Sequence, residues 1–150
     1  MSVRARALRN QIPPVDVVHG DVVSVSGDWK PAVEEEIRRA AFIFVSAGGS
    51  PGLEWELDLI FSDDSLLARA MILVPIDMKN TIRCEFDSLL ARSSRPPAKQ
   101  LEGLGDLSGS IIRFTPDGRI VQIRFDGSVL GFEQVLRSFV LAVPDRRAAA

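Results

Sequence analysis

The sequence predicts a three-layer α/β domain with a mainly parallel sheet, followed by a C-terminal β-hairpin and helix. Short apolar segments alternate with segments whose apolar residues recur every three or four positions, as strands alternating with helices do. The run at residues 42–46 (FIFVS) has the continuous hydrophobicity of a strand buried on both faces, which is typical of parallel sheets. Alternation of this kind predicts a sheet covered by helices on both faces.

The predicted elements of the first half follow from local signals. Residues 15–25 are rich in valine and predict one or two short strands. A helix then begins after Asp28, with an apolar face that recurs every four residues: Trp29, Val33, Ile37 and Ala41. The strand at 42–46 leads through a loop of small residues to a second helix, in which Ser50 is the N-cap and Pro51 the first residue. That helix buries Leu53, Leu57, Ile60 and Phe61.

The second half predicts a strand, a helix, a hairpin and a last helix. The strand covers residues 70–74 and ends at Pro75. A helix follows from about Met78 to Ser93, and residues 93–110 form a mobile connection rich in Ser, Pro and Gly. The apolar runs at 111–114 and 120–125 flank the sequence TPDG, which predicts a tight turn and therefore a hairpin. The last helix covers residues 132–143 and stops before Pro144.

The composition fits one ordinary globular domain. The chain has 150 residues, of which 46% are hydrophobic and 25% are charged, and this balance excludes a disordered chain. Its 18 basic and 20 acidic side chains give a net charge of −2, so no strong field attracts nucleic acid or an acidic membrane. The longest apolar run, residues 40–45, is far shorter than the roughly 20 residues that span a bilayer. We therefore expect no nucleic-acid partner and no transmembrane segment in this chain.

The chain divides into three expected parts. Residues 1–14 form a flexible basic N-terminus, residues 15–143 a single domain, and residues 144–150 a frayed tail. The basic segment has no apolar stretch of the kind that a secretory signal needs, so an Arg-rich leader, a frayed end and a remnant of a longer protein all stay open. The one cysteine, Cys84, cannot form an internal disulfide, which indicates a cytoplasmic location and a small buried side chain. The one histidine, His19, is distant in sequence, so we expect no metal site.

The glycine-rich loop between the strand at 42–46 and the next helix is the strongest candidate for a site. Residues 48–52 match the pattern G-x-S-x-G of serine hydrolases, but Pro51 lacks the N–H that would complete the oxyanion hole. The loop lies beyond the carboxyl end of a predicted parallel strand, where such sheets bind ligands. Its N–H groups would either hold a phosphate or ribose, or simply form a tight turn, and both interpretations stay open.

Three acids follow in the first turns of the next helix. Glu54 and Asp58 are expected to face solvent or to cap the helix N-terminus, where the helix dipole stabilises a negative charge. Glu56 differs because it lies three residues after Leu53 and four before Ile60, so it flanks the buried face and borders the loop. A carboxylate at that place would hydrogen-bond a sugar hydroxyl or stabilise a developing oxocarbenium ion.

The segment AFIFVSAGGSPGLEWELDLI (residues 41–60) resembles the core of a TIR (Toll/interleukin-receptor) domain. In both, a hydrophobic strand ending in Ser leads through a short loop into a helix with Trp and a Glu-Leu pair. The flanking segments at 27–40 and 68–76 resemble the preceding helix and the next strand of that fold. The chain is more similar to a group of bacterial TIR-like domains with a P-G-L-x-W-E-L signature, which are often joined to membrane segments. The resemblance covers about residues 15–76.

This resemblance implies a TIR-like, Rossmann-like arrangement and two alternative functions. The first is a signalling module that self-associates or binds a protein partner, as a cytoplasmic part of a larger or membrane-associated system. The second is a glycohydrolase that takes NAD as its substrate and needs no further cofactor. Some TIR domains cleave the glycosidic bond of NAD with a glutamate at this helix position, which corresponds to Glu56. Trp55 and the loop residues Ser46, Gly48, Gly49 and Ser50 would then line the nucleotide pocket.

Overall fold

The structure is a computed structural model that describes residues 28–76, 79–125 and 128–142. The predicted strand at 15–25, His19, the basic N-terminus and the tail lie outside the described residues. The described part is a mixed α/β fold whose strands are β1 (Ile43–Ser46), β2 (Ala70–Val74), β3 (Ser110–Phe114) and β4 (Ile120–Arg124). Its helices are α1 (Lys30–Arg39), α2 (Pro51–Phe61), α3 (Asp64–Leu67), α4 (Thr81–Arg92), α5 (Pro96–Glu102) and α6 (Val129–Ala142).

The sheet is mixed, with the strand order β1-β2-β3-β4. β1 and β2 are parallel and place Ile43 opposite Ala70, whereas β2–β3 and β3–β4 are antiparallel. This differs from the mainly parallel sheet that the sequence predicts. The reason lies in α5, which forms where a mobile connection was expected. One helix after β2 would return the chain to the end of the sheet where β2 begins, and the next strand would be parallel to β2. The pair α4–α5 instead brings the chain back to the end where β2 finishes, so β3 starts there and runs antiparallel.

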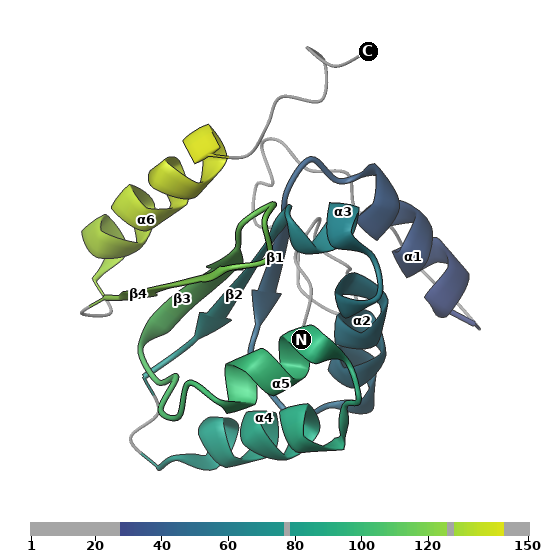
Figure 1. Ribbon diagram of the computed structural model, residues 1–150, viewed down its shortest axis with the longest axis horizontal. Helices are drawn as coiled ribbons and strands as arrows, with labels where there is room; N and C mark the ends of the chain where they lie inside the picture. The colour runs from purple at the N-terminus through teal and green to yellow at the C-terminus, as the bar shows by residue number, and fades with distance from the viewer. Residues whose placement is uncertain (1–27, 77–78, 126–127, 143–150) are drawn as a thin grey trace, which may run out of the picture.

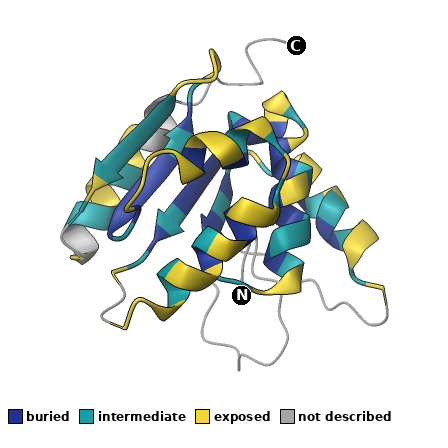
Figure 2. Cartoon of the chain, turned by 60° about the horizontal axis from the view of Figure 1, so that its bottom comes forward, coloured by how far each residue is buried: buried dark blue, intermediate teal, exposed yellow. Residues whose placement is uncertain are grey.

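Helices cover both faces of the sheet (Figure 1). On one face α1, α2, α4 and α5 bury the larger core, which includes Ile37, Ile43, Leu57, Phe86 and Ile112. On the other face α6 packs Phe132, Val135 and Leu136 against Phe42, Phe44, Met71, Leu73 and Ile111. The central strands β2 and β3 are therefore buried, whereas β4 is only half-buried along most of its length (Figure 2).

The local signals that the sequence carries are largely confirmed. β2 covers residues 70–74 as expected, and Ser50 caps α2 through the N–H of Leu53 at 3.2 Å. The hairpin turn closes with a bond from the Thr115 N–H to the Arg119 carbonyl at 2.8 Å, and Gly118 has the positive φ of 81° that this turn requires. The buried cysteine is a wrong expectation, because Cys84 is exposed on α4. Among the described residues, no helix has the length and apolar character needed to cross a membrane.

Candidate functional site

The residues of the loop between β1 and α2 make structural contacts at both of its ends. Ser46 is the last residue of β1 and pairs with Leu73 of β2. The Ser50 hydroxyl accepts the N–H of Leu53, so this side chain is used as the helix cap. Pro51 then begins α2, where its missing N–H costs no hydrogen bond. Ser50 therefore has a structural role that accounts for its presence without a ligand.

Gly49 packs directly against α4. A Cβ atom on Gly49 would lie 2.6 Å from the Glu85 Cβ and 3.3 Å from the Glu85 Oε2. At Gly48, by contrast, a Cβ would meet its nearest neighbour, a Leu53 methyl, at an ordinary 3.8 Å. The glycine at position 49 thus permits a close approach of loop and helix, and it places a carboxylate beside the loop. A negative charge there opposes the binding of a phosphate by the loop N–H groups.

Trp55 is engaged in contacts within the domain. Its ring meets the Trp29 ring edge to face, with 5.2 Å between centroids, and the Lys30 Nζ lies 5.8 Å from its centroid. Trp29 also covers Gly52, where an added Cβ would lie 3.6 Å from the Trp29 ring. An edge-to-face pair and a cation over a ring each stabilise by about 1 kcal/mol. The stacking surface expected for a nucleotide is therefore partly used to hold α1 against α2.

The three acids of α2 have separate surroundings. Glu54 pairs with Arg92 of α4 at 3.0 Å, and Asp58 pairs with Arg95 of α5 at 2.7 Å. The hydrogen bonds from these guanidinium groups hold the pKa of both carboxyls below their usual values. Both side chains are solvent-exposed, by 42% and 56%, as expected, and their ion pairs also link α2 to the two helices beside it.

Glu56 is buried, with only 3% of its surface exposed. It lies on α2 next to Leu57, on the inner side of the helix that the spacing predicts. Burial of a carboxylate is costly unless polar groups compensate for the lost water, so this position is unusual for an acid. The two cavities described below are lined by other residues.

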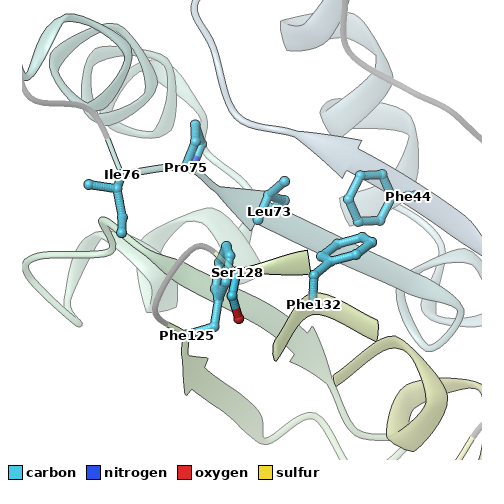
Figure 3. Close-up of a pocket in the computed structure, with 7 residues that line it drawn as sticks. All are labelled: Phe44, Leu73, Pro75, Ile76, Phe125, Ser128 and Phe132. Atoms are coloured by element: carbon cyan, nitrogen blue, oxygen red, sulfur yellow. The ribbon is translucent and has the colours of Figure 1, made fainter. Parts of the chain in front are cut away.

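The larger of these cavities lies on the other face of the sheet, and the sequence did not indicate it (Figure 3). It has a volume of about 550 Å³ and opens at the carboxyl end of β2, next to the start of α6. We call it the aromatic cavity and define it by its lining residues: Phe44, Leu73, Pro75, Ile76, Phe125, Ser128 and Phe132. The smaller cavity, of about 90 Å³, lies deeper between the sheet and α6.

The walls of the aromatic cavity are almost wholly apolar. The rings of Phe44 and Phe132 meet edge to face with 5.7 Å between centroids, and they close one end (Figure 3). Ile76 lies toward the other end and is 55% exposed, which is unusual for a large apolar side chain. Of the described residues in the lining, Ser128 alone is polar, and its hydroxyl accepts the Gly131 N–H at 3.0 Å. A signal that could have indicated this cavity is the alternation of Phe42 and Phe44 with the buried residues of β1, which places both rings on the α6 side.

Metal chemistry has no support in the part of the chain that the structure describes, because no three potential ligand side chains gather there. Comparison of the whole chain with protein-family models, with curated proteins and with solved structures found no match. The function is therefore inferred from the chemistry of the two candidate places, namely the glycine loop with Glu56 and the aromatic cavity.

Proposed function

We propose that this domain is a TIR-like interaction module, which binds an uncharged apolar group of a signalling partner in the aromatic cavity. The observation that carries the proposal is the cavity itself, with three phenylalanine rings around about 550 Å³ of space. That volume lies within the range of about 300–1,000 Å³ that is typical of ligand pockets. Among the residues that the structure describes, none that lines the cavity is titratable. An apolar group would gain by leaving water there, whereas a charged one would lose its hydration without compensation.

The contacts at the glycine loop support binding without chemistry at that loop. Glu85 lies against Gly49, the Ser50 hydroxyl caps α2, and the Trp55 ring contacts Trp29. The Ser50 hydroxyl and the Trp55 ring therefore stabilise the fold itself. The negative charge of Glu85 also disfavours the pyrophosphate of a dinucleotide at this place.

A dye titration tests the proposal with two matched variants. Ile76 and Leu104 are both large, apolar and exposed, by 55% and 42%, but only Ile76 lines the cavity. Binding of the neutral dye Nile red is followed by its fluorescence. We expect Ile76→Asp to weaken binding at least tenfold, because a charge at the rim must be desolvated, and Leu104→Asp to leave it unchanged. Equal loss in both variants, or no saturable binding by the wild type, would refute the proposal.

The buried carboxylate of Glu56 favours a second candidate function, hydrolysis of the glycosidic bond of NAD. A carboxylate in a site with little water is well suited to stabilise an oxocarbenium-like transition state. The test compares nicotinamide release by concentrated wild-type protein and by Glu56→Gln, with circular dichroism to establish that both are folded. Release by the wild type that is lost in a folded variant would overturn the binding-only proposal. No release by the wild type would eliminate the second candidate.

A further inference from the structure

The backbone of β4 presents hydrogen-bonding groups on its outer edge. The Phe125 N–H bonds to the Gly109 carbonyl and the Thr115 N–H to the Arg119 carbonyl, so residues 119 and 125 point toward β3. Inward and outward residues alternate along an antiparallel strand. With the register that places Gln122 opposite Ile112, residues 121 and 123 also point inward. The N–H and C=O groups of Ile120, Gln122 and Arg124 therefore point away from the sheet.

Within the described part of the chain, β4 pairs only with β3, and it is the last strand of the sheet. The helix α6 packs on one face of the sheet, with cluster partners on β1, β2 and β3, and it lines the smaller cavity together with Val121 and Ile123 of β4. Edge strands are usually protected by proline, by a bulge or by inward-pointing charges. The strand IVQIR has no proline, its register with β3 is unbroken, and its one charged residue, Arg124, lies at its end.

We infer that β4 pairs antiparallel with β4 of a second copy of this chain, about a two-fold axis that passes beside Gln122. In this register Gln122 lies opposite the same residue of the second copy, and Ile120 lies opposite Arg124 on both sides of the axis. All three outward residues of each strand then exchange hydrogen bonds, about six in total. A shift of the register by two residues would leave outward groups without partners.

The side chains of β4 fit a second copy better than an unrelated strand. The two-fold register keeps the two Arg124 side chains apart, each facing an isoleucine, and like charges directly opposite would be destabilising. At the centre two neutral amides face each other. The Gln122 Nε2 donates a hydrogen bond to the Ser110 Oγ at 2.8 Å, and this bond orients the Gln122 side chain for the pair. Because one strand edge is smaller than the roughly 1,200–2,000 Å² of stable interfaces, the dimer should form reversibly.

A charge-swap experiment on the full chain tests this axis. Gln122→Lys and Gln122→Glu each place like charges opposite one another in the homodimer, whereas a mixture of the two variants pairs opposite charges. Both replacements retain a partner for the Ser110 hydroxyl. Gln100 is exposed on α5, so Gln100→Lys and Gln100→Glu give matched controls with the same changes of charge. Analytical ultracentrifugation over a range of concentrations measures the mass, and melting curves establish that every variant is folded.

We expect the wild type to rise from its monomer mass of 16.4 kDa toward twice that value with increasing concentration. Each Gln122 variant alone should need at least tenfold more protein to dimerise, the equimolar mixture should recover wild-type association, and the Gln100 controls should match the wild type. A wild type that stays monomeric at millimolar concentration would overturn the inference. A mixture that associates no better than either Gln122 variant alone would overturn the proposed axis. Neither result depends on the aromatic cavity, so the two proposals fail separately.

Discussion

Substitution of Gly49 by alanine tests whether the glycine loop is built for packing against α4. The added Cβ would lie 2.6 Å from the Glu85 Cβ, an atom fixed to the helix backbone, so the loop or α4 must move. At Gly48 the same atom would find ordinary contact at 3.8 Å. Neither glycine has a positive φ, so alanine is compatible with the backbone at both positions. The two substitutions therefore differ only in the space available.

The expected magnitudes follow from that difference. Overpacking at Gly49 lowers the free energy of unfolding by about 1–3 kcal/mol. Replacing glycine also reduces the entropy of the unfolded chain, which offsets this loss by about 0.4–1 kcal/mol. Gly49→Ala should therefore lower the free energy of unfolding by about 1–2 kcal/mol, which corresponds to a fall in Tm of about 2–8 °C for a chain of this size. Gly48→Ala should leave stability unchanged or raise it by up to about 1 kcal/mol.

Urea denaturation followed by circular dichroism measures both variants. A double-mutant cycle with Glu85→Gly adds a direct test, because removal of that Cβ should relieve the clash and give a coupling of about 0.5–3 kcal/mol. Glu85→Gly alone costs about 1 kcal/mol, since glycine is unfavourable in a helix. Equal stability of Gly48→Ala and Gly49→Ala, or a coupling near zero, would refute the close packing of loop and helix.

Three further substitutions test individual contacts. Ser50→Ala removes the oxygen that accepts the Leu53 N–H, so urea denaturation should show a loss of about 1 kcal/mol, and an unchanged midpoint would contradict the cap. Phe86→Ala empties a site that is 1% exposed and should cost about 3–5 kcal/mol in the same assay, whereas a loss below about 1 kcal/mol would contradict its place in the core. Asp58→Asn tests the pair with Arg95, which lowers the pKa of Asp58. A lowered pKa stabilises the fold above the unfolded value of about 3.9, and this contribution is lost as the pH falls through the folded pKa. The variant should therefore be less stable than the wild type near neutral pH and equal to it in strong acid, and a constant difference across pH would be inconsistent with this pair.

The sequence predicts best those elements that begin or end at a local signal. Pro75 follows the end of β2, Ser50 and Pro51 start α2, and the glycine of TPDG closes the hairpin. Each signal acts on the backbone within a few residues, through a fixed φ, a missing N–H or a side-chain cap. Such effects do not depend on the rest of the fold, which is why a single sequence reveals them.

The direction of β3 could not be predicted because it depends on α5. Two consecutive prolines at Pro96 and Pro97 favoured a connection, yet both are tolerated in the first turn of a helix. Ala98 and Leu101 then bury this short helix in the core. Periodicity is too weak to reveal a helix of seven residues, and without that helix the sequence predicts a single crossing of the sheet rather than a return.

The candidate site was predicted in part for the same reason. Glu56 lies on the inner side of α2, as its spacing from Leu53 and Ile60 indicates, but spacing cannot tell a buried side chain from one at a cleft. The role of Gly49 depends on Glu85, which lies far along the chain on α4. The aromatic cavity needs side chains from β1, β2, α6 and the end of β4, so only the folded arrangement brings it together.

NMR chemical-shift mapping with two ligands tests most directly whether the domain binds apolar groups in the aromatic cavity. The protein is titrated separately with a small neutral aromatic compound and with NAD. We expect the aromatic compound to shift the amide signals of Leu73, Phe125 and Phe132, and NAD to leave those of Gly48, Gly49 and Glu56 unchanged. Shifts at the glycine loop with NAD, together with none around the cavity with the aromatic compound, would contradict it.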